Sequence, residues 1–194
     1  TLTLLGVVED GKLVRLWGAR RNVTDRKRYQ SLLEHLAFRD PLTGLLNRQR
    51  LVAEINENIE QSGHRGDDPS AALLLLDLNQ FKDINDTLGH DMGDTVLTEV
   101  SRRFLSHLRQ YDVCARWGGE EFLIVLPQTC IESARKVADK LRRTIAGHNF
   151  GSVGPQTASF GIAVWHAGDT AKTLFVRVDH AMSQSKHDGR NCVT

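Results

Sequence analysis

The segment 116–122 has the sequence RWGGEEF and is followed by a run of apolar residues. Tandem glycines between strand-like segments predict a tight hairpin, because such turns require positive φ angles, which glycine adopts without steric cost. The two strands of the hairpin are expected at 113–117 and 121–126. Glu120 and Glu121 follow the glycines directly, and adjacent like charges rarely open a strand unless something positive neutralises them. A solvated acidic turn is the alternative.

A second strand-like segment, 71–78, is a run of apolar residues with Asp77 near its end. Continuous apolar runs are typical of strands that are buried on both faces. Two such strands, each with a carboxylate at one end, suggest a site for a divalent cation between Asp77 and Glu120. Carboxylate oxygens are hard ligands and favour Mg²⁺ or Mn²⁺. Alternatively, Asp77 could cap the helix that follows the strand.

The chain has 194 residues, which is enough for one ordinary domain with an appendage. Its net charge of +1 gives no support for a surface that coats a nucleic acid. The three cysteines are widely spaced and form no CxxC pair, so we expect reduced thiols in the cytoplasm. No apolar run approaches the roughly 20 residues of a membrane span. Because the chain begins inside a strand-like segment, we expect it to be part of a longer protein.

Residues 40–194 alternate between helical and strand-like patterns. This alternation predicts an α/β fold in which helices pack against one sheet. Helices are expected at 48–61, in a short segment after the strand 71–78, and at 91–109, 131–146 and 171–186. A further strand is expected at 156–165, in addition to those at 71–78, 113–117 and 121–126.

The RWGGEEF segment contains GGEEF, a common form of the pentapeptide that marks GGDEF domains, the diguanylate cyclases. Four other segments agree with that family in order and spacing: DPLTGLLNR at 40–48, DLNQFKDINDTLGHDMGD at 77–94, SFGIA at 159–163 and KHDGRN at 186–191. The chain thus resembles a GGDEF domain over 40–194. The resemblance implies a palm-like, mostly antiparallel sheet flanked by helices, related to nucleotide cyclases and polymerases.

The N-terminal part is expected to form a β-hairpin and a helix. Strand-like runs at 2–8 and 13–20 flank Asp10-Gly11, a strong two-residue hairpin signal. Residues 1–23 resemble the C-terminal hairpin of a PAS sensory domain, with a generic hairpin as the alternative. Residues 24–39 have a helical apolar period and resemble a linker or signalling helix. Its apolar stripe could dock on the domain body or pair in a parallel dimer.

The resemblance implies a metal-dependent catalytic centre. Asp77, Glu120 and the backbone carbonyl of Leu78 would ligate two Mg²⁺ (or Mn²⁺) ions in each half of the active site. Glu121 would either bind metal or help to deprotonate the attacking hydroxyl. The family usually has aspartate at the position of Asn79. We interpret Asn79 as a helix cap, because asparagine caps as well as aspartate does; the lost charge could instead weaken metal binding.

The resemblance also implies how a nucleotide would be held. Lys82, Lys186 and Arg190 match family contacts to phosphate, and Phe81 belongs to a helix start whose N–H groups can cradle phosphates. A second set of positions concerns the base and the product. Asn85 and Asp94 match the guanine-reading pair, so GTP is expected rather than ATP. Arg109 and Asp112 match RxxD, the family's inhibitory product-binding motif. A salt bridge at the end of a helix is the simpler interpretation of these two residues.

Together these features predict a diguanylate cyclase that joins two GTP molecules into cyclic di-GMP, releases two pyrophosphates and is inhibited by its product. Each domain would supply half of the site, so catalysis requires a homodimer. Two alternatives stay open. The domain could be an inactive module that binds cyclic di-GMP or GTP, or a regulator of an adjoining phosphodiesterase domain.

Overall fold

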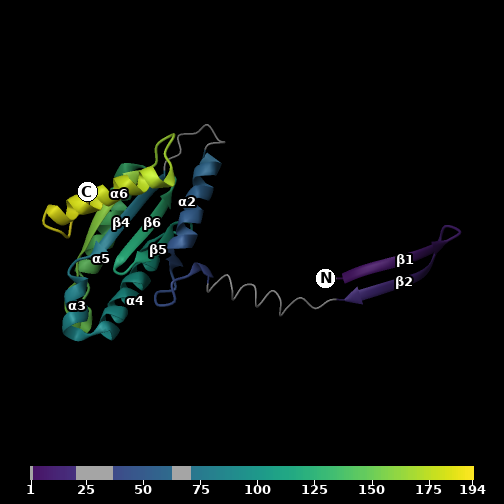
Figure 1. The fold of residues 1–194 in the computed structure, drawn as a ribbon, viewed down its shortest axis with the longest axis horizontal. Helices are drawn as coiled ribbons and strands as arrows, with labels where there is room; N and C mark the ends of the chain where they lie inside the picture. Colours follow the sequence, from purple (N-terminus) through teal and green to yellow (C-terminus); the bar gives the residue numbers. More distant parts are fainter. Residues whose placement is uncertain (1, 21–36, 63–70) are drawn as a thin grey trace. The chain divides into compact units, whose positions relative to one another are not determined.

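The computed structural model describes residues 2–20, 37–62 and 71–194. The chain divides into two compact units, 1–37 and 38–194, which are drawn in Figure 1. Most of the helix expected at 24–39 lies outside the described residues. Within the described ranges, no helix is both long enough and apolar enough to cross a membrane.

The first unit contains the expected hairpin. Strands β1 (Leu2–Glu9) and β2 (Lys12–Arg20) are antiparallel. Glu9 pairs with Lys12, so Asp10 and Gly11 form the two-residue loop, with φ angles of 48° and 72°. Large apolar side chains of both strands are exposed to solvent: Val7, Val8, Leu13, Val14 and Trp17.

The second unit is built on one five-stranded sheet with the order β3-β5-β6-β4-β7. The strands are β3 (Leu46–Asn47), β4 (Ala71–Leu78), β5 (Val113–Gly118), β6 (Glu121–Pro127) and β7 (Ala158–Val164). Only the pair β3–β5 is parallel; the pairs β5–β6, β6–β4 and β4–β7 are antiparallel. The prediction of a mostly antiparallel sheet is confirmed.

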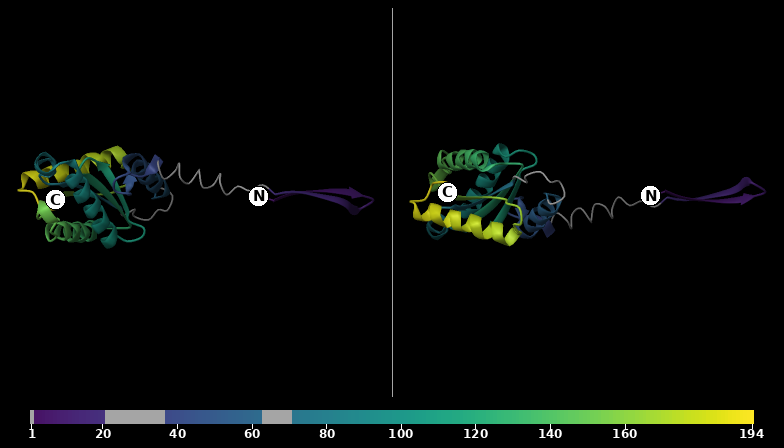
Figure 2. Two further views of the ribbon diagram at one scale, coloured as in Figure 1. Left: turned by 90° about the horizontal axis from the view of Figure 1, so that it is seen from below. Right: turned by 90° about the horizontal axis from the view of Figure 1, so that it is seen from above.

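Helices cover both faces of this sheet. They are α2 (Arg48–Ser62), α3 (Phe81–Leu88), α4 (His90–His107), α5 (Ile131–Ala146) and α6 (Ala171–His187), with a short 3-10 helix at Gly151–Val153. One apolar cluster joins the sheet to α3, α4 and α5, and the other joins it to α2 and α6. Figure 2 shows α5 (green) and α6 (yellow) on opposite sides of the sheet.

The central strand β4 explains how the two layers are held together. Successive side chains of a strand point to opposite faces. Leu74, Leu76 and Leu78 accordingly belong to the α3–α4–α5 cluster, whereas Leu73 and Leu75 belong to the α2–α6 cluster. By the same alternation, the side chain of Asp77 lies on the α2–α6 face.

Helix α6 approaches β7 closely at Gly161. A Cβ atom added to Gly161 would lie 2.3 Å from the backbone nitrogen of Met182 and 2.4 Å from the carbonyl oxygen of Val178. A side chain at this position would therefore push α6 away from the sheet. The close approach brings the C-terminal end of α6 to the strand ends where the predicted carboxylates lie.

Candidate active site

The catalytic hairpin differs in detail from the prediction. Gly118 pairs with Glu121, so the two-residue loop consists of Gly119 and Glu120. Gly119 has a φ of 44°, whereas Gly118 belongs to strand β5. Glu120 therefore lies in the turn and Glu121 is the first residue of β6, so the two glutamates are not consecutive residues of one strand.

Asp77 faces Glu121 across the sheet. The two residues are directly opposite in the antiparallel register of β4 and β6, and Ser159 of β7 is opposite Asp77 on its other side. Residues that are directly opposite in an antiparallel pair share a face of the sheet. The structure thus brings the strand carboxylate of Asp77 together with the first carboxylate of β6, on the face covered by α2 and α6.

The three carboxylates repel one another and are partly removed from water. Burial raises the pKa of Asp77 above its usual value, and the negative charge of Glu120 adds to that effect. Burial likewise raises the pKa of Glu121, with further contributions from Asp77 and Glu120. Three mutually repelling carboxylates of this kind are stabilised by nearby positive charge.

Two basic residues from the C-terminal part of the chain supply such charge. Lys186 Nζ lies 2.8 Å from Asp77 Oδ2. The hydrogen bond from Lys186 and the charge of Arg190 both act to lower the pKa of Asp77, and they offset only part of the effect of burial. Arg190 adopts a left-handed backbone with a φ of 64°, which turns the chain immediately after α6.

The residues present fit a divalent cation held by few protein ligands. The N–H of Leu78 donates to the carbonyl of Glu120 over 3.4 Å, which places the backbone of Leu78 beside the turn. In the described part of the chain, no three His, Cys, Asp or Glu side chains form a metal-ligating group. Ligation by Asp77, Glu120 and a backbone carbonyl would leave positions for substrate phosphates and water, as is usual for Mg²⁺.

The prediction that Asn79 caps a helix is wrong. The residue before α3 is Gln80, with a φ of 58°, and no side chain caps the helix. Asn79 is buried; its Nδ2 donates to Thr157 Oγ1 and its Oδ1 accepts from Ser159 Oγ, both over 2.8 Å. Its N–H also donates to the carbonyl of Thr157. Asn79 thus fastens the end of β4 to the beginning of β7.

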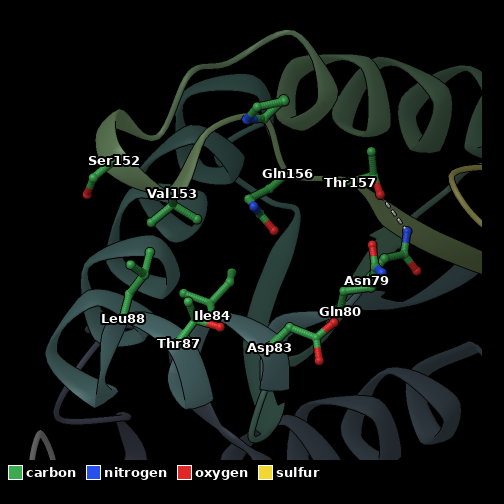
Figure 3. Close-up of a pocket in the computed structure, with 11 residues that line it drawn as sticks. Asn79, Gln80, Asp83, Ile84, Thr87, Leu88, Ser152, Val153, Gln156 and Thr157 are labelled. Atoms are coloured by element: carbon green, nitrogen blue, oxygen red, sulfur yellow. Dashed lines mark hydrogen bonds between the residues drawn. The ribbon is translucent and has the colours of Figure 1, made fainter.

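Three sides of helix α3 face different environments: the core, the solvent and a cavity. Phe81 is buried in the core, and Lys82 is exposed in the first turn. A third side of the helix lines a cavity of about 480 Å³, shown in Figure 3, whose other walls include Val153 and Gln156. Residues lining this cavity carry one carboxylate and no basic side chain, so it does not coincide with the phosphate-contacting residues expected from the sequence.

Asn85 and Asp94 lie on neighbouring helices that pack against each other. A Cβ atom added to Gly93 would lie 2.1 Å from Asn85 Oδ1, so the absence of a side chain at Gly93 lets Asn85 approach α4. Asn85 is half-buried and Asp94 is exposed. The structure therefore places Asn85 against the helix that carries Asp94, at the residue next to Asp94.

Arg109 and Asp112 lie just after α4 and form a tight turn. The N–H of Arg109 donates to Asp112 Oδ2 over 2.7 Å, and the guanidinium donates to the hydroxyl of Tyr111 over 3.0 Å. The described residues show no Arg109–Asp112 ion pair, and Asp112 Oδ1 is buried without a hydrogen-bond partner. The simple salt bridge considered from the sequence is not present.

One contact of the catalytic turn had no assigned role in the sequence analysis. Arg116 Nη1 lies 3.3 Å from both carboxylate oxygens of Asp40, and Arg116 Nε donates to the carbonyl of Gly119 over 3.0 Å. The N–H and the hydroxyl of Thr43 also donate to Asp40. The segments containing Asp40 and Arg116 were both recognised as motifs, but sequence gives no signal that they touch.

This chain is similar in sequence and in fold to known proteins. Residues 37–192 match the family model described as diguanylate cyclase, GGDEF domain. Diguanylate cyclase DgcM of Escherichia coli is 39% identical over 172 residues, which are 89% of this chain and 42% of that protein. The chain thus spans about two fifths of the length of that relative.

Two solved structures are similar in fold. Diguanylate cyclase SiaD of Pseudomonas aeruginosa, in complex with its activator SiaC, has a TM-score of 0.78 and 38% identity, covering 88% of this chain and 68% of that one. The coiled coil and GGDEF domain of DgcB from Caulobacter crescentus, in complex with c-di-GMP, has a TM-score of 0.85 and 26% identity, covering 89% and 92%. Because the family model matches residues 37–192, which are most of this chain, the chain belongs to the GGDEF diguanylate cyclase domain family.

Proposed function

We propose that this domain is an active diguanylate cyclase that joins two GTP molecules into cyclic di-GMP and releases two pyrophosphates. The observation that carries the proposal is the convergence of Asp77, Glu120 and Glu121 at one end of the sheet, with Lys186 paired to Asp77. Buried like charges of this kind cost stability. A bound cation and a triphosphate with its metal ions would offset this repulsion.

Asp77, Glu120 and the carbonyl of Leu78 are the groups that would hold the metal, proposed as two Mg²⁺ or Mn²⁺ ions in each half-site. Bound there, the ions would supply positive charge to the triphosphate and lower the pKa of the attacking hydroxyl. Glu121 lies directly opposite Asp77 in the register of β4 and β6 and is not among the proposed metal ligands. We assign Glu121 to taking up the proton of the 3′-hydroxyl.

The triphosphate would lie between the catalytic turn and the beginning of α3. Lys82 in the first turn of α3, together with Lys186 and Arg190, would contact its phosphates. Among the described residues other than its two chain neighbours, a Cβ atom added to Gly118 would meet nothing within 4 Å. Packing within the chain therefore does not require glycine at this position, and we attribute it to a close approach of the phosphates.

Asn85 and Asp94 would select guanine. A carboxylate accepts hydrogen bonds from the N1–H and the 2-amino group of guanine, and adenine offers neither at those positions. An unpaired carboxylate in the base site would disfavour ATP by a few kcal/mol.

The reaction needs two domains facing each other, because each proposed half-site holds one GTP. The 3′-hydroxyl of one nucleotide would attack the α-phosphate of the other, in line with the leaving pyrophosphate. A homodimer, at least a transient one, is therefore part of the proposed mechanism.

Product feedback is proposed at Arg109 and Asp112. The Arg109 guanidinium has no carboxylate partner among the described residues, and Asp112 Oδ1 is buried without a hydrogen-bond donor. An arginine can grip a phosphate with two hydrogen bonds and stack on a purine, so this turn suits cyclic di-GMP.

The N-terminal unit is proposed to be the end of a PAS domain, with residues 24–39 as the signalling helix. In support, the hairpin exposes Val8, Leu13 and Trp17, each of them about 60% accessible. Apolar side chains in such number on a hairpin are normally covered by further strands.

The test is an incubation of the protein with GTP and Mg²⁺, with nucleotides resolved by chromatography. Wild type should form cyclic di-GMP, and Asp77→Asn and Glu120→Gln should each fall below about one hundredth of its rate, since each removes charge aimed at the transition state. Glu132→Gln, at an exposed glutamate of α5, is the matched control and should keep the wild-type rate.

Two outcomes would contradict the proposal. Turnover unaffected by Asp77→Asn and Glu120→Gln would remove the assigned site. Binding of GTP or cyclic di-GMP without any product from wild type would instead favour a regulatory module, of an adjoining phosphodiesterase domain or another partner.

A further inference from the structure

Trp117 lies at an irregularity in the hairpin, immediately before the catalytic turn. The register between β5 and β6 shifts between Arg116 and Gly118, which leaves Trp117 as the extra residue of a β-bulge. Bulges re-aim side chains and increase the local twist of a strand, and they are over-represented next to active sites. The position of the following turn thus depends on how the bulged residue is held.

The indole of Trp117 is held between two other helices. It stacks on Phe175 of α6 with ring centroids 4.6 Å apart and an interplanar angle of 24°. Arg48, the first residue of α2, places its guanidinium carbon 4.4 Å from the centroid of the indole. Aromatic pairs and cation–π contacts at such distances favour one orientation of the ring, which burial alone would not specify.

The turn is thereby fastened from both faces of the sheet. On the α3–α4–α5 side, Arg116 donates to the carbonyl of Gly119 and pairs with Asp40. On the α2–α6 side, Trp117 packs against the apolar cluster beneath those two helices. The hydrogen bond from Arg116 to Gly119 fixes the backbone of the turn, and Trp117 fixes the strand that precedes it.

Helix α6 links this contact to the other half of the carboxylate cluster. Phe175 lies in its first half, and Lys186, which pairs with Asp77, lies in its last turn. Helix α6 thus contacts Trp117 through Phe175 and Asp77 through Lys186. Because Trp117 precedes the turn that carries Glu120, a displacement of the indole relative to Phe175 would alter the position of Glu120 relative to Asp77.

We propose that Trp117 is a positioning residue for catalysis, clamped between Phe175 and Arg48 so that Glu120 is held at the distance from Asp77 that the reaction requires. This proposal rests on the diguanylate cyclase activity proposed above. A misplacement of about 1 Å can cost about 10²-fold in rate, so loss of the clamp should lower kcat while binding of GTP is largely kept.

The activity test compares three substitutions. Trp117→Leu removes both the stack and the cation–π contact. At saturating Mg²⁺, kcat should fall about 10- to 100-fold with KM for GTP changed less than about threefold. Trp117→Phe keeps an aromatic face and should recover most of the rate. Trp165→Leu is the matched control, because Trp165 packs on the same apolar cluster at the far end of the sheet. There its backbone N–H donates to the carbonyl of Ala71, a bond that the substitution keeps, and kcat should stay near wild type.

A spectroscopic test works without turnover. With Trp17 and Trp165 replaced by Phe, Trp117 is the remaining indole of the sequence, and its emission should change on titration with Mg²⁺ together with a non-hydrolysable GTP analogue. In the same background, Phe175→Leu should raise the half-saturating Mg²⁺ concentration about tenfold, because the metal-binding carboxylates are no longer held together.

The outcomes separate this proposal from the assigned activity. Absence of product from wild type would count against the proposed cyclase activity. The emission titration would then still test whether the contacts of Trp117 with Phe175 and Arg48 hold the metal-binding carboxylates together. A kcat of Trp117→Leu equal to that of Trp165→Leu, or a Mg²⁺ titration unchanged by Phe175→Leu, would show that Trp117 is an ordinary packing residue.

Discussion

The ion pair between Arg116 and Asp40 should stabilise the domain more than the long distance between its charged atoms suggests. Its atoms are 3.3 Å apart, and each side chain is 17% exposed. Exposed ion pairs contribute about 0–1 kcal/mol, whereas removing one partner of a buried pair costs about 3–5 kcal/mol. For intermediate exposure, Arg116→Leu should cost about 2 kcal/mol, which for a domain of this size lowers Tm by about 4–8 °C.

A shorter but more exposed pair provides the control. Arg102 lies 2.8 Å from Glu99, and its side chain is 67% exposed. Solvent screens this pair, so Arg102→Leu should cost less than about 1 kcal/mol. Both variants are measured by urea unfolding with a common m-value. An equal or larger loss for Arg102→Leu would refute the reasoning that burial, rather than distance, sets the contribution.

The pH dependence gives a second check on the same contact. Burial acts to raise the pKa of Asp40, but hydrogen bonds from Thr43 and the charge of Arg116 outweigh it, so the pKa is lower than usual. A lowered pKa contributes stability above the unfolded-state pKa of about 4, and that stability is lost as the pH falls through the folded-state value. The Tm difference between wild type and Arg116→Leu should therefore shrink below about pH 4.

Four further changes test other parts of the structure. Glu121 has a raised pKa, so its charge destabilises the metal-free fold as the pH rises above about 4; Glu121→Gln should raise Tm at pH 7 without Mg²⁺, and the gain should disappear near pH 3. Gly161→Ala should lower stability by about 1–3 kcal/mol and reduce the rate, measured by urea unfolding and product formation, because the methyl group forces α6 off the sheet. Asp94→Ser should narrow the preference for GTP over ATP, measured as the ratio of kcat/KM values; comparable wild-type rates with both nucleotides would exclude guanine reading. Arg109→Ala should continue turnover after wild-type progress curves flatten and should weaken cyclic di-GMP binding in calorimetry, whereas equal affinity would exclude the product site.

The order of elements and the identity of the acidic cluster could be predicted from the sequence because both depend on local patterns. The apolar run of β4 and the glycines before Glu120 specify strands and a turn through chain geometry alone. Helix ends were predicted within two residues for α4 and α6. The antiparallel sheet order came from the family resemblance rather than from the patterns themselves.

Contacts between distant segments could not be predicted in this way. The assignment of Asn79 to a cap followed a local rule, but its side chain is bound by Thr157 and Ser159, which follow about eighty positions later. The turn was expected to begin at Gly118, and only the strand register shows that the loop is Gly119 and Glu120. Register depends on the bulge at Trp117, which no spacing rule in the sequence reveals.

The amide at position 79 has a consequence for how the domain responds to its ionic surroundings. Its bonds to Thr157 and Ser159 join β4 to β7 without adding a charge beside Asp77, Glu120 and Glu121. A carboxylate there would add a fourth negative charge and would lose the hydrogen bond that the amide Nδ2 donates to Thr157. With an amide, this particular joint between β4 and β7 is independent of pH and of divalent salt.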